Sequence, residues 1–81
     1  MVEVTFYTKE QCPLCEKGFT LLKALQRELS FSINVIDIYQ EDALVEKYGM
    51  MIPVVAIDNE EIDFGILSEE KIRKRLLKKI G

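Results

Sequence analysis

Thr8-Lys9-Glu10-Gln11-Cys12-Pro13-Leu14-Cys15 is the stretch that decides the fold, and it holds both cysteines of the 81-residue chain. An alternating apolar segment ends just before it, and a helical pattern begins at Pro13. Because proline suits the first helical position, Cys12 falls at the helix N-cap, where the positive end of the helix dipole favours a thiolate. Residues i and i+3 of a helical turn lie about 5–6 Å apart at Cβ, which is close enough for a disulfide. We therefore predict that Cys12 and Cys15 cycle between dithiol and disulfide.

The composition is that of a small globular protein, and we expect a single domain over residues 1–81. The chain is 48% hydrophobic and 31% charged, and its net charge of −3 gives no reason to expect a nucleic-acid or anionic-membrane partner. No apolar run approaches the roughly 18–20 residues of a membrane span, and the first residues lack the features of a secretion signal. We expect a cytoplasmic monomer.

Cysteine usage favours chemistry over a structural role. Two cysteines three residues apart close too short a loop to add much stability, and in a reducing compartment such a pair is more often catalytic or metal-binding. The chain has no histidine, which removes Cys-His catalysis and the commonest metal ligand. We expect no metal site within the single chain.

The rest of the sequence alternates strand and helix patterns. Periodicity and turn residues predict strands at 2–7, 31–38, 53–58 and 62–64 and helices at 13–30, 40–48 and 69–80. The first two strands and the helix between them form a βαβ unit, so the sheet starts parallel. The order β-α-β-α-β-β-α predicts an α/β fold with a four-stranded mixed sheet flanked by three helices.

Apolar stripes predict which helix faces are buried. The expected inward positions are Leu14, Gly18, Leu21, Leu22, Leu25 and Leu29 in the first helix, Leu44, Val45 and Tyr48 in the second, and Ile72, Leu76, Leu77 and Ile80 in the last. The nearly continuous apolar end of the second strand predicts cover on both faces. Six basic residues between 71 and 79 are interpreted as a solvated helix face, with a docking patch as the alternative.

The element order, with Cys-x-x-Cys between the first strand and first helix, resembles the thioredoxin superfamily. Within it the chain is most similar to glutaredoxins and their small glutaredoxin-like relatives. The segment Tyr7 to Cys15 matches their pattern of an aromatic residue, a small hydroxyl residue, a basic residue three before the first cysteine, and Cys-Pro-x-Cys. Met51-Ile52-Pro53 stands where that family has Thr-Val-Pro.

The resemblance implies a division of roles around the two sulfurs. Cys12 would be the exposed nucleophile and Cys15 the more buried resolving thiol, with a cis Ile52–Pro53 bond beside them. The backbone of Ile52 would pair with an extended peptide or with glutathione, and Lys9 would supply positive charge. Taken together, the substrate-contacting residues would be Lys9, Gln11, Pro13, Leu14, Met51, Ile52 and Pro53.

Two departures from the glutaredoxin pattern bear on the substrate. Leu14 replaces the aromatic residue that is usual between the cysteines. The Gly-Gly and Thr/Ser-Asp that hold a glutathione carboxylate are missing, and Asp63 places a negative charge where that anion would be received. We therefore favour disulfide-containing protein substrates, with glutathione as a further candidate partner.

The sequence predicts a thiol–disulfide oxidoreductase that reduces protein or mixed disulfides and binds no cofactor of its own. No nucleotide-binding signature is present, so electrons would come from glutathione or from a flavoprotein of the thioredoxin-reductase type. An iron–sulfur or metal carrier is the alternative, which would need ligands from a second chain or from glutathione. A thioredoxin-like module that binds a partner without turnover is a second alternative.

Overall fold

The structure is a computed structural model that describes residues 1–81. Its elements are β1 (Val2–Thr8), α1 (Pro13–Glu28), β2 (Phe31–Asp37), the 3-10 turn η1 (Ile38–Gln40), α2 (Asp42–Tyr48), β3 (Val54–Ile57), β4 (Glu60–Phe64) and α3 (Glu69–Ile80). The four strands form one sheet in the order β2-β1-β3-β4, in which β1 runs parallel to β2 and antiparallel to β3. The predicted α/β architecture, with a four-stranded mixed sheet and three helices, is confirmed.

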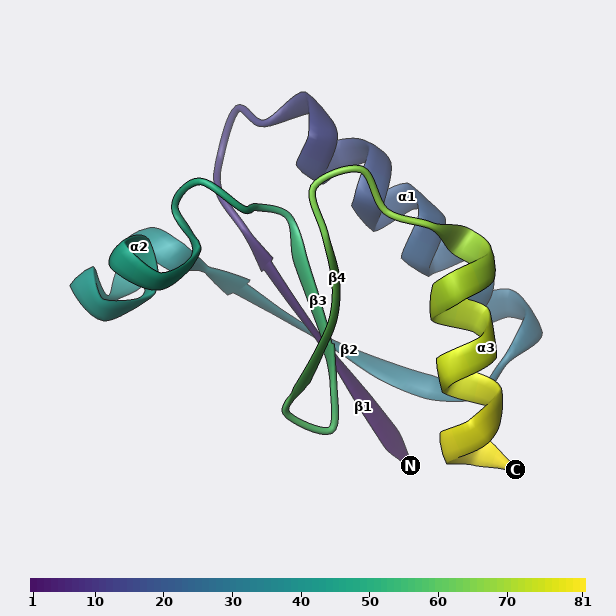
Figure 1. The fold of residues 1–81 in the computed structure, drawn as a ribbon. Helices are drawn as coiled ribbons and strands as arrows, with labels where there is room; N and C mark the ends of the chain where they lie inside the picture. Colours follow the sequence, from purple (N-terminus) through teal and green to yellow (C-terminus); the bar gives the residue numbers. More distant parts are fainter.

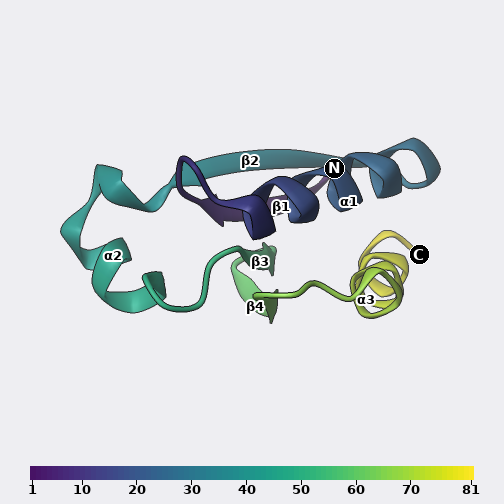
Figure 2. The ribbon, with the colours of Figure 1, turned by 90° about the horizontal axis from the view of Figure 1, so that it is seen from above.

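The helices lie on both sides of the sheet (Figures 1 and 2). Helices α1 and α3 cover one face, and α2 lies on the opposite side, near one end of the strands. Successive side chains of a strand point to opposite faces, so Val4 and Phe6 of β1 face α1 and α3 while Tyr7 faces α2. None of the helices combines the length and hydropathy that crossing a bilayer requires.

The main core lies between the sheet and the pair α1 and α3. It contains Phe6, Leu22, Leu25, Ile72 and Leu76, all essentially inaccessible to solvent. Fully burying a side chain of this size stabilises a fold by about 1.5–3 kcal/mol, so this layer supplies most of the driving force. The two cysteines belong to the same cluster, which fixes the start of α1 against the sheet.

A smaller cluster anchors α2 on the other face. Tyr48 packs with Ile38 and Val54, and its ring centroid lies 4.5 Å from that of Tyr7. The Tyr48 hydroxyl donates a hydrogen bond to the Glu61 carboxylate in β4. Burial raises the pKa of Tyr48 well above its ordinary value, and the bond to Glu61 raises it further. Helix α2 is therefore tied to three strands, β1, β3 and β4, through one aromatic side chain.

Several predicted boundaries and faces were wrong. Helix α1 ends at Glu28, short of the predicted residue 30, and α2 begins at Asp42 because the 3-10 turn precedes it. Val35 is 51% exposed although the end of its strand was predicted to be covered on both faces, because β2 is an edge strand. Three residues assigned to inward stripes are instead exposed: Leu14, Leu77 and Ile80.

The hairpin between β3 and β4 is tighter than predicted. Asp58 and Asn59 both have positive φ, at 49° and 71°, and form a two-residue turn. This is the backbone that two-residue hairpins require, and Asp and Asn adopt it more readily than most residues. Strand β4 therefore begins at Glu60 rather than at residue 62.

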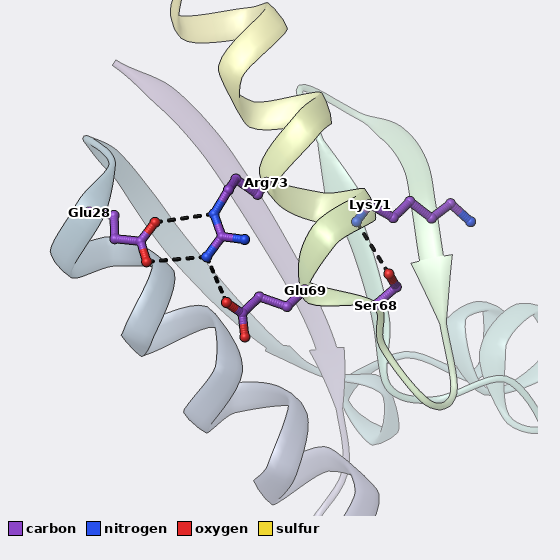
Figure 3. A network of polar contacts seen from close by, with 5 residues as sticks. All are labelled: Glu28, Ser68, Glu69, Lys71 and Arg73. Carbon is purple, nitrogen blue, oxygen red and sulfur yellow. Dashed lines mark hydrogen bonds and ion pairs between the residues drawn. The ribbon is translucent and has the colours of Figure 1, made fainter.

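Arg73 joins α3 to α1 in a network of polar contacts (Figure 3). Its guanidinium donates to both carboxylate oxygens of Glu28, at 3.1 Å each, and to Glu69 at 2.6 Å. These hydrogen bonds raise the pKa of Arg73, with Glu28 contributing most. The Ser68 hydroxyl accepts from the backbone N–H of Lys71 at 3.2 Å, so Ser68 is the N-cap of α3.

Candidate functional site

Cys12 lies at the N-cap of α1, with Pro13 in the first turn, as predicted. Its backbone is extended, with φ −125° and ψ 101°, and its sulfur accepts a hydrogen bond from the backbone N–H of Cys15 at 3.2 Å. Gln11, just before it, has φ +53°, a left-handed conformation that costs a non-glycine residue about 1–2 kcal/mol. This turn redirects the chain from β1 into the helix. The Cys12 sulfur thus meets the free N–H groups of the first helical turn.

Both cysteines are free thiols and both are largely buried. Cys12 is 9% exposed and Cys15 is 3% exposed. The predicted order of accessibility is therefore correct, but the expectation that Cys12 is exposed was wrong. The cause is the N-cap geometry, which turns the Cys12 sulfur back towards the Cys15 amide.

A cavity of about 400 Å³ gives access to both sulfurs. Its apolar side chains are Phe6 of β1, Phe19 of α1 and Val35 of β2, and its polar residues are Thr8, Lys9, Glu10, Gln11 and Glu16. It brings Lys9 and Gln11, two of the predicted substrate-contacting residues, together with the cysteines. The cavity contains one cationic and two anionic side chains, so its field does not by itself favour a bound anion.

The surroundings of Cys15 keep its sulfur protonated. Burial raises the pKa of the Cys15 thiol, and a hydrogen bond with the Cys12 sulfur raises it further. Hydrogen bonds from the Thr8 hydroxyl and the Lys9 backbone act in the opposite direction, because they stabilise the thiolate. The Cys12 sulfur, with its N–H donor and its place at the front of the helix, is the better placed of the two to attack first.

The Ile52–Pro53 peptide bond is cis, in agreement with the resemblance. Tyr7 pairs with Val54, so the end of β1 and the start of β3 lie at the same end of the sheet. Pro53 is buried and approaches α1 at Gly18, where an added Cβ would lie 3.3 Å from the proline Cγ. Gly18 is one turn beyond Cys15, so the proline lies beside the helical turn that carries the cysteines.

The loop before β3 is held by backbone hydrogen bonds. The Gly65 N–H donates to the carbonyls of Met51 and Pro53, at 3.1 and 2.8 Å. The Ile52 N–H donates to the Tyr48 carbonyl at 3.2 Å, so only the Ile52 carbonyl lacks a backbone partner. The implied pairing of Ile52 with an incoming chain can therefore use its carbonyl directly, whereas its N–H is already engaged.

The remaining predicted contact residues are not gathered in the cysteine cavity. Leu14 lines a separate cavity of about 170 Å³ together with Ile66 and Leu67. Met51 lines a third, of about 230 Å³, beside Phe64. Pro13 is exposed at the start of α1. The structure thus distributes these residues over two other cavities and the exposed start of α1.

Asp63 does not act as an open negative charge. Its carboxylate accepts from the backbone N–H of Ser68 at 2.7 Å and of Phe64 at 3.0 Å, and it pairs with Lys71 at 3.7 Å. Only 11% of its side chain is exposed. The predicted charge is therefore compensated locally, because the turn after β4 folds it towards the start of α3. It nevertheless occupies N–H groups that an external carboxylate would need.

Sequence reasoning missed the apolar part of the cysteine cavity. Phe19 follows Cys15 by four residues and therefore shares its face of α1, a signal that was present in the spacing. Val35 enters the cavity because it pairs with Phe6 across the parallel β1 and β2 strands. That register is a tertiary property, and no local pattern indicated it.

Comparisons with known proteins agree on fold and family. A solution NMR structure of a Nitrosomonas europaea protein is 27% identical, with a TM-score of 0.83, over 93% of this chain and 91% of that one. An X-ray structure of an X. campestris protein is 24% identical, with a TM-score of 0.76, over 93% and 96% of the two chains. A mutant thioredoxin from Halobacterium salinarum is 18% identical, with a TM-score of 0.75, over 99% of this chain and 75% of that one.

The last likeness shows the thioredoxin-like fold. A search of curated protein sequences gave no match. The model of the glutaredoxin-like domain (DUF836), however, matches residues 3–77, which is nearly the whole chain. The chain therefore belongs to the glutaredoxin-like domain (DUF836) family.

Proposed function

We propose that the protein is a thiol–disulfide oxidoreductase that uses the Cys12 and Cys15 dithiol to reduce protein or mixed disulfides. The observation that carries the proposal is the hydrogen bond from the Cys15 N–H to the Cys12 sulfur at the start of α1. It places one sulfur where a helix stabilises negative charge and the second sulfur one turn away. Membership of a glutaredoxin-like family supports the same chemistry.

The reaction proceeds in two exchanges. The Cys12 thiolate attacks one sulfur of a substrate disulfide, forming a mixed disulfide and releasing the other substrate sulfur as a thiolate. Cys15 then loses its proton and attacks the Cys12 sulfur, which releases the second substrate thiolate. The substrate has gained two electrons, and Cys12 and Cys15 are left as a disulfide. An external thiol or flavoprotein reductant, such as glutathione or a thioredoxin-reductase-like enzyme, returns the pair to the dithiol.

The residues around the two cysteines favour protein disulfides as the substrate class. The Asp63 carboxylate already occupies the Ser68 N–H at the start of α3, which reduces what a small anionic peptide could bind there. Apolar side chains are also exposed next to the cysteine motif. Leu14, between the two cysteines, is 41% exposed, and Ile66, which lines the same cavity as Leu14, is 83% exposed. Such a surface suits the apolar residues that flank a disulfide in a polypeptide.

The test is a reduction assay with two parallel electron supplies. Insulin disulfide reduction is measured with glutathione and its reductase, and separately with thioredoxin reductase. Cys12→Ser should abolish activity in both systems, and Cys15→Ser should accumulate a covalent mixed disulfide that mass spectrometry detects. Full activity of Cys12→Ser in either system would overturn the proposal. Activity of Cys15→Ser with glutathione alone would reassign the reaction to a one-thiol route.

A further inference from the structure

Thr8 is the last residue of β1, directly before the cysteine loop, and its hydroxyl has two candidate acceptors, the Lys9 carbonyl and the Cys15 sulfur. It donates to the Lys9 carbonyl at 3.4 Å, and it lowers the pKa of the Cys15 thiol. The side chain is half-buried and lines the same cavity as both sulfurs. The strand therefore places a hydroxyl in the same cavity as the thiol that must resolve the mixed disulfide.

The two acceptors are not equal. An O–H···O hydrogen bond is normally 2.5–3.0 Å long, so the 3.4 Å contact with the Lys9 carbonyl is weak. A hydroxyl has a single proton to donate and rotates to the best acceptor. A thiolate is charged, and hydrogen bonds to charged acceptors are about twice as strong as neutral ones. The proton of Thr8 is thus loosely held until Cys15 ionises.

Cys15 needs such a donor because of where it lies. The residue is 3% exposed in an apolar cluster, where a bare thiolate is costly. The charged or titratable groups that line the same cavity are Cys12, Lys9, Glu10 and Glu16. The carboxylates oppose a second negative charge, whereas the Thr8 hydroxyl and the Lys9 backbone lower the pKa of the Cys15 thiol.

We propose that Thr8 is a positioning residue for the resolving step, and that its hydroxyl turns from the Lys9 carbonyl to the Cys15 thiolate as that thiolate forms. The inference rests on the proposed function. In this step the Cys15 proton passes to a base in solution through the cavity, and a Cys15 electron pair forms the bond to the Cys12 sulfur. The bond between Cys12 and the substrate sulfur breaks, and the substrate leaves as a thiolate. Thr8 keeps its proton throughout.

The experiment separates the two exchanges by stopped-flow absorbance. The reduced protein is mixed with a symmetric nitroaryl disulfide, so that the attack of Cys12 releases one coloured thiolate and the attack of Cys15 releases a second. Thr8→Val removes the hydroxyl and keeps the shape. It should leave the first phase unchanged and slow the second about tenfold at pH 7, because a lost hydrogen bond to a charged acceptor corresponds to about one pKa unit.

The pH profile and a conservative variant distinguish hydrogen bonding from packing. The midpoint of the second phase should move to higher pH in Thr8→Val, and Thr8→Ser should restore both rate and midpoint. Thr8→Ala, which also removes the methyl group, must slow the second phase as well. Thr5→Val makes the same change on the same strand outside the cavity, and it should leave both phases at wild-type values.

The outcomes are separable. A second phase in Thr8→Val that matches wild type at every pH, or a Thr8→Ser variant as slow as Thr8→Val, would overturn the role of Thr8 alone. A wild-type protein without a first phase, or a first phase that survives Cys12→Ser, would overturn the proposed function itself.

Discussion

Gly18→Ala tests the close approach of Pro53 to the helix that carries the cysteines. The new Cβ would lie 2.9 Å from Leu67 Cδ1, 3.3 Å from Phe6 Cε1 and 3.3 Å from Pro53 Cγ. Carbon atoms pack best at about 3.5–4.0 Å, so all three contacts are too short. The tip of Leu67 can rotate away, but Phe6 and Pro53 are rings buried in the core and have little room to move.

Two terms of opposite sign decide the result. Alanine is about 1 kcal/mol better than glycine inside a helix. Overpacking of a well-packed core costs about 1–3 kcal/mol. With rigid neighbours on two sides, we expect the second term to exceed the first and to leave a net loss of about 1 kcal/mol. For a domain of this size that lowers Tm by about 4–8 °C.

Urea unfolding followed by circular dichroism measures the effect as a change in midpoint at constant m-value. Thr20→Ala is the matched control, because it changes an exposed position of the same helix and reports propensity without packing. When Gly18→Ala is introduced into a Leu67→Ala background, it should cost less stability than in the wild-type background. The difference is the part of the loss that the contact with Leu67 causes. A Gly18→Ala protein as stable as wild type, or more stable, would refute the claim that Phe6 and Pro53 cannot give way.

Three further predictions concern stability. Gly65→Ala, at φ +68° in open space, should cost about 1 kcal/mol from backbone strain alone, measured by urea unfolding. Arg73→Met should lower Tm in low salt, with a deficit that shrinks in high salt; an equal deficit at both would exclude the ion pairs as its cause. The raised pKa of Cys15 means that the folded state holds this proton more tightly than the unfolded chain. The reduced protein should therefore lose stability as pH rises above about 8.5, and Cys15→Ala should flatten that loss. The comparison is made below pH 10, because above that pH the raised pKa of Tyr48 would cause a further loss of stability.

Local rules accounted for the parts of the site that depend on a few neighbouring residues. Cys12 at the N-cap, Pro13 in the first turn and Ser68 at the next helix start all follow from the unpaired N–H groups of a helix. The element order followed from periodicity and turn residues along the chain, and the family resemblance followed from that order, the Tyr7 to Cys15 segment and the proline before β3. These features require no knowledge of what packs against them.

Features that depend on a distant partner were not predictable in the same way. Val35 has the sequence pattern of a core residue, but its strand is at the sheet edge and its side chain is 51% exposed. Leu77 and Ile80 continue the stripe of α3, yet both remain exposed. The inward turn of Asp63 depends on Ser68, five residues later, and on a loop geometry that periodicity does not describe. Charge at a position was predictable, whereas its neutralisation was not.

The loop before β3 has a mechanical consequence. Four backbone groups of Met51, Ile52 and Pro53 are hydrogen-bonded to Tyr48, the last residue of α2, or to Gly65, which follows β4. Any shift of α2 or of the turn after β4 therefore moves the Ile52 carbonyl, which has no backbone partner. Conversely, a chain that docks on that carbonyl acts on a segment that is anchored both to α2 and to the turn after β4.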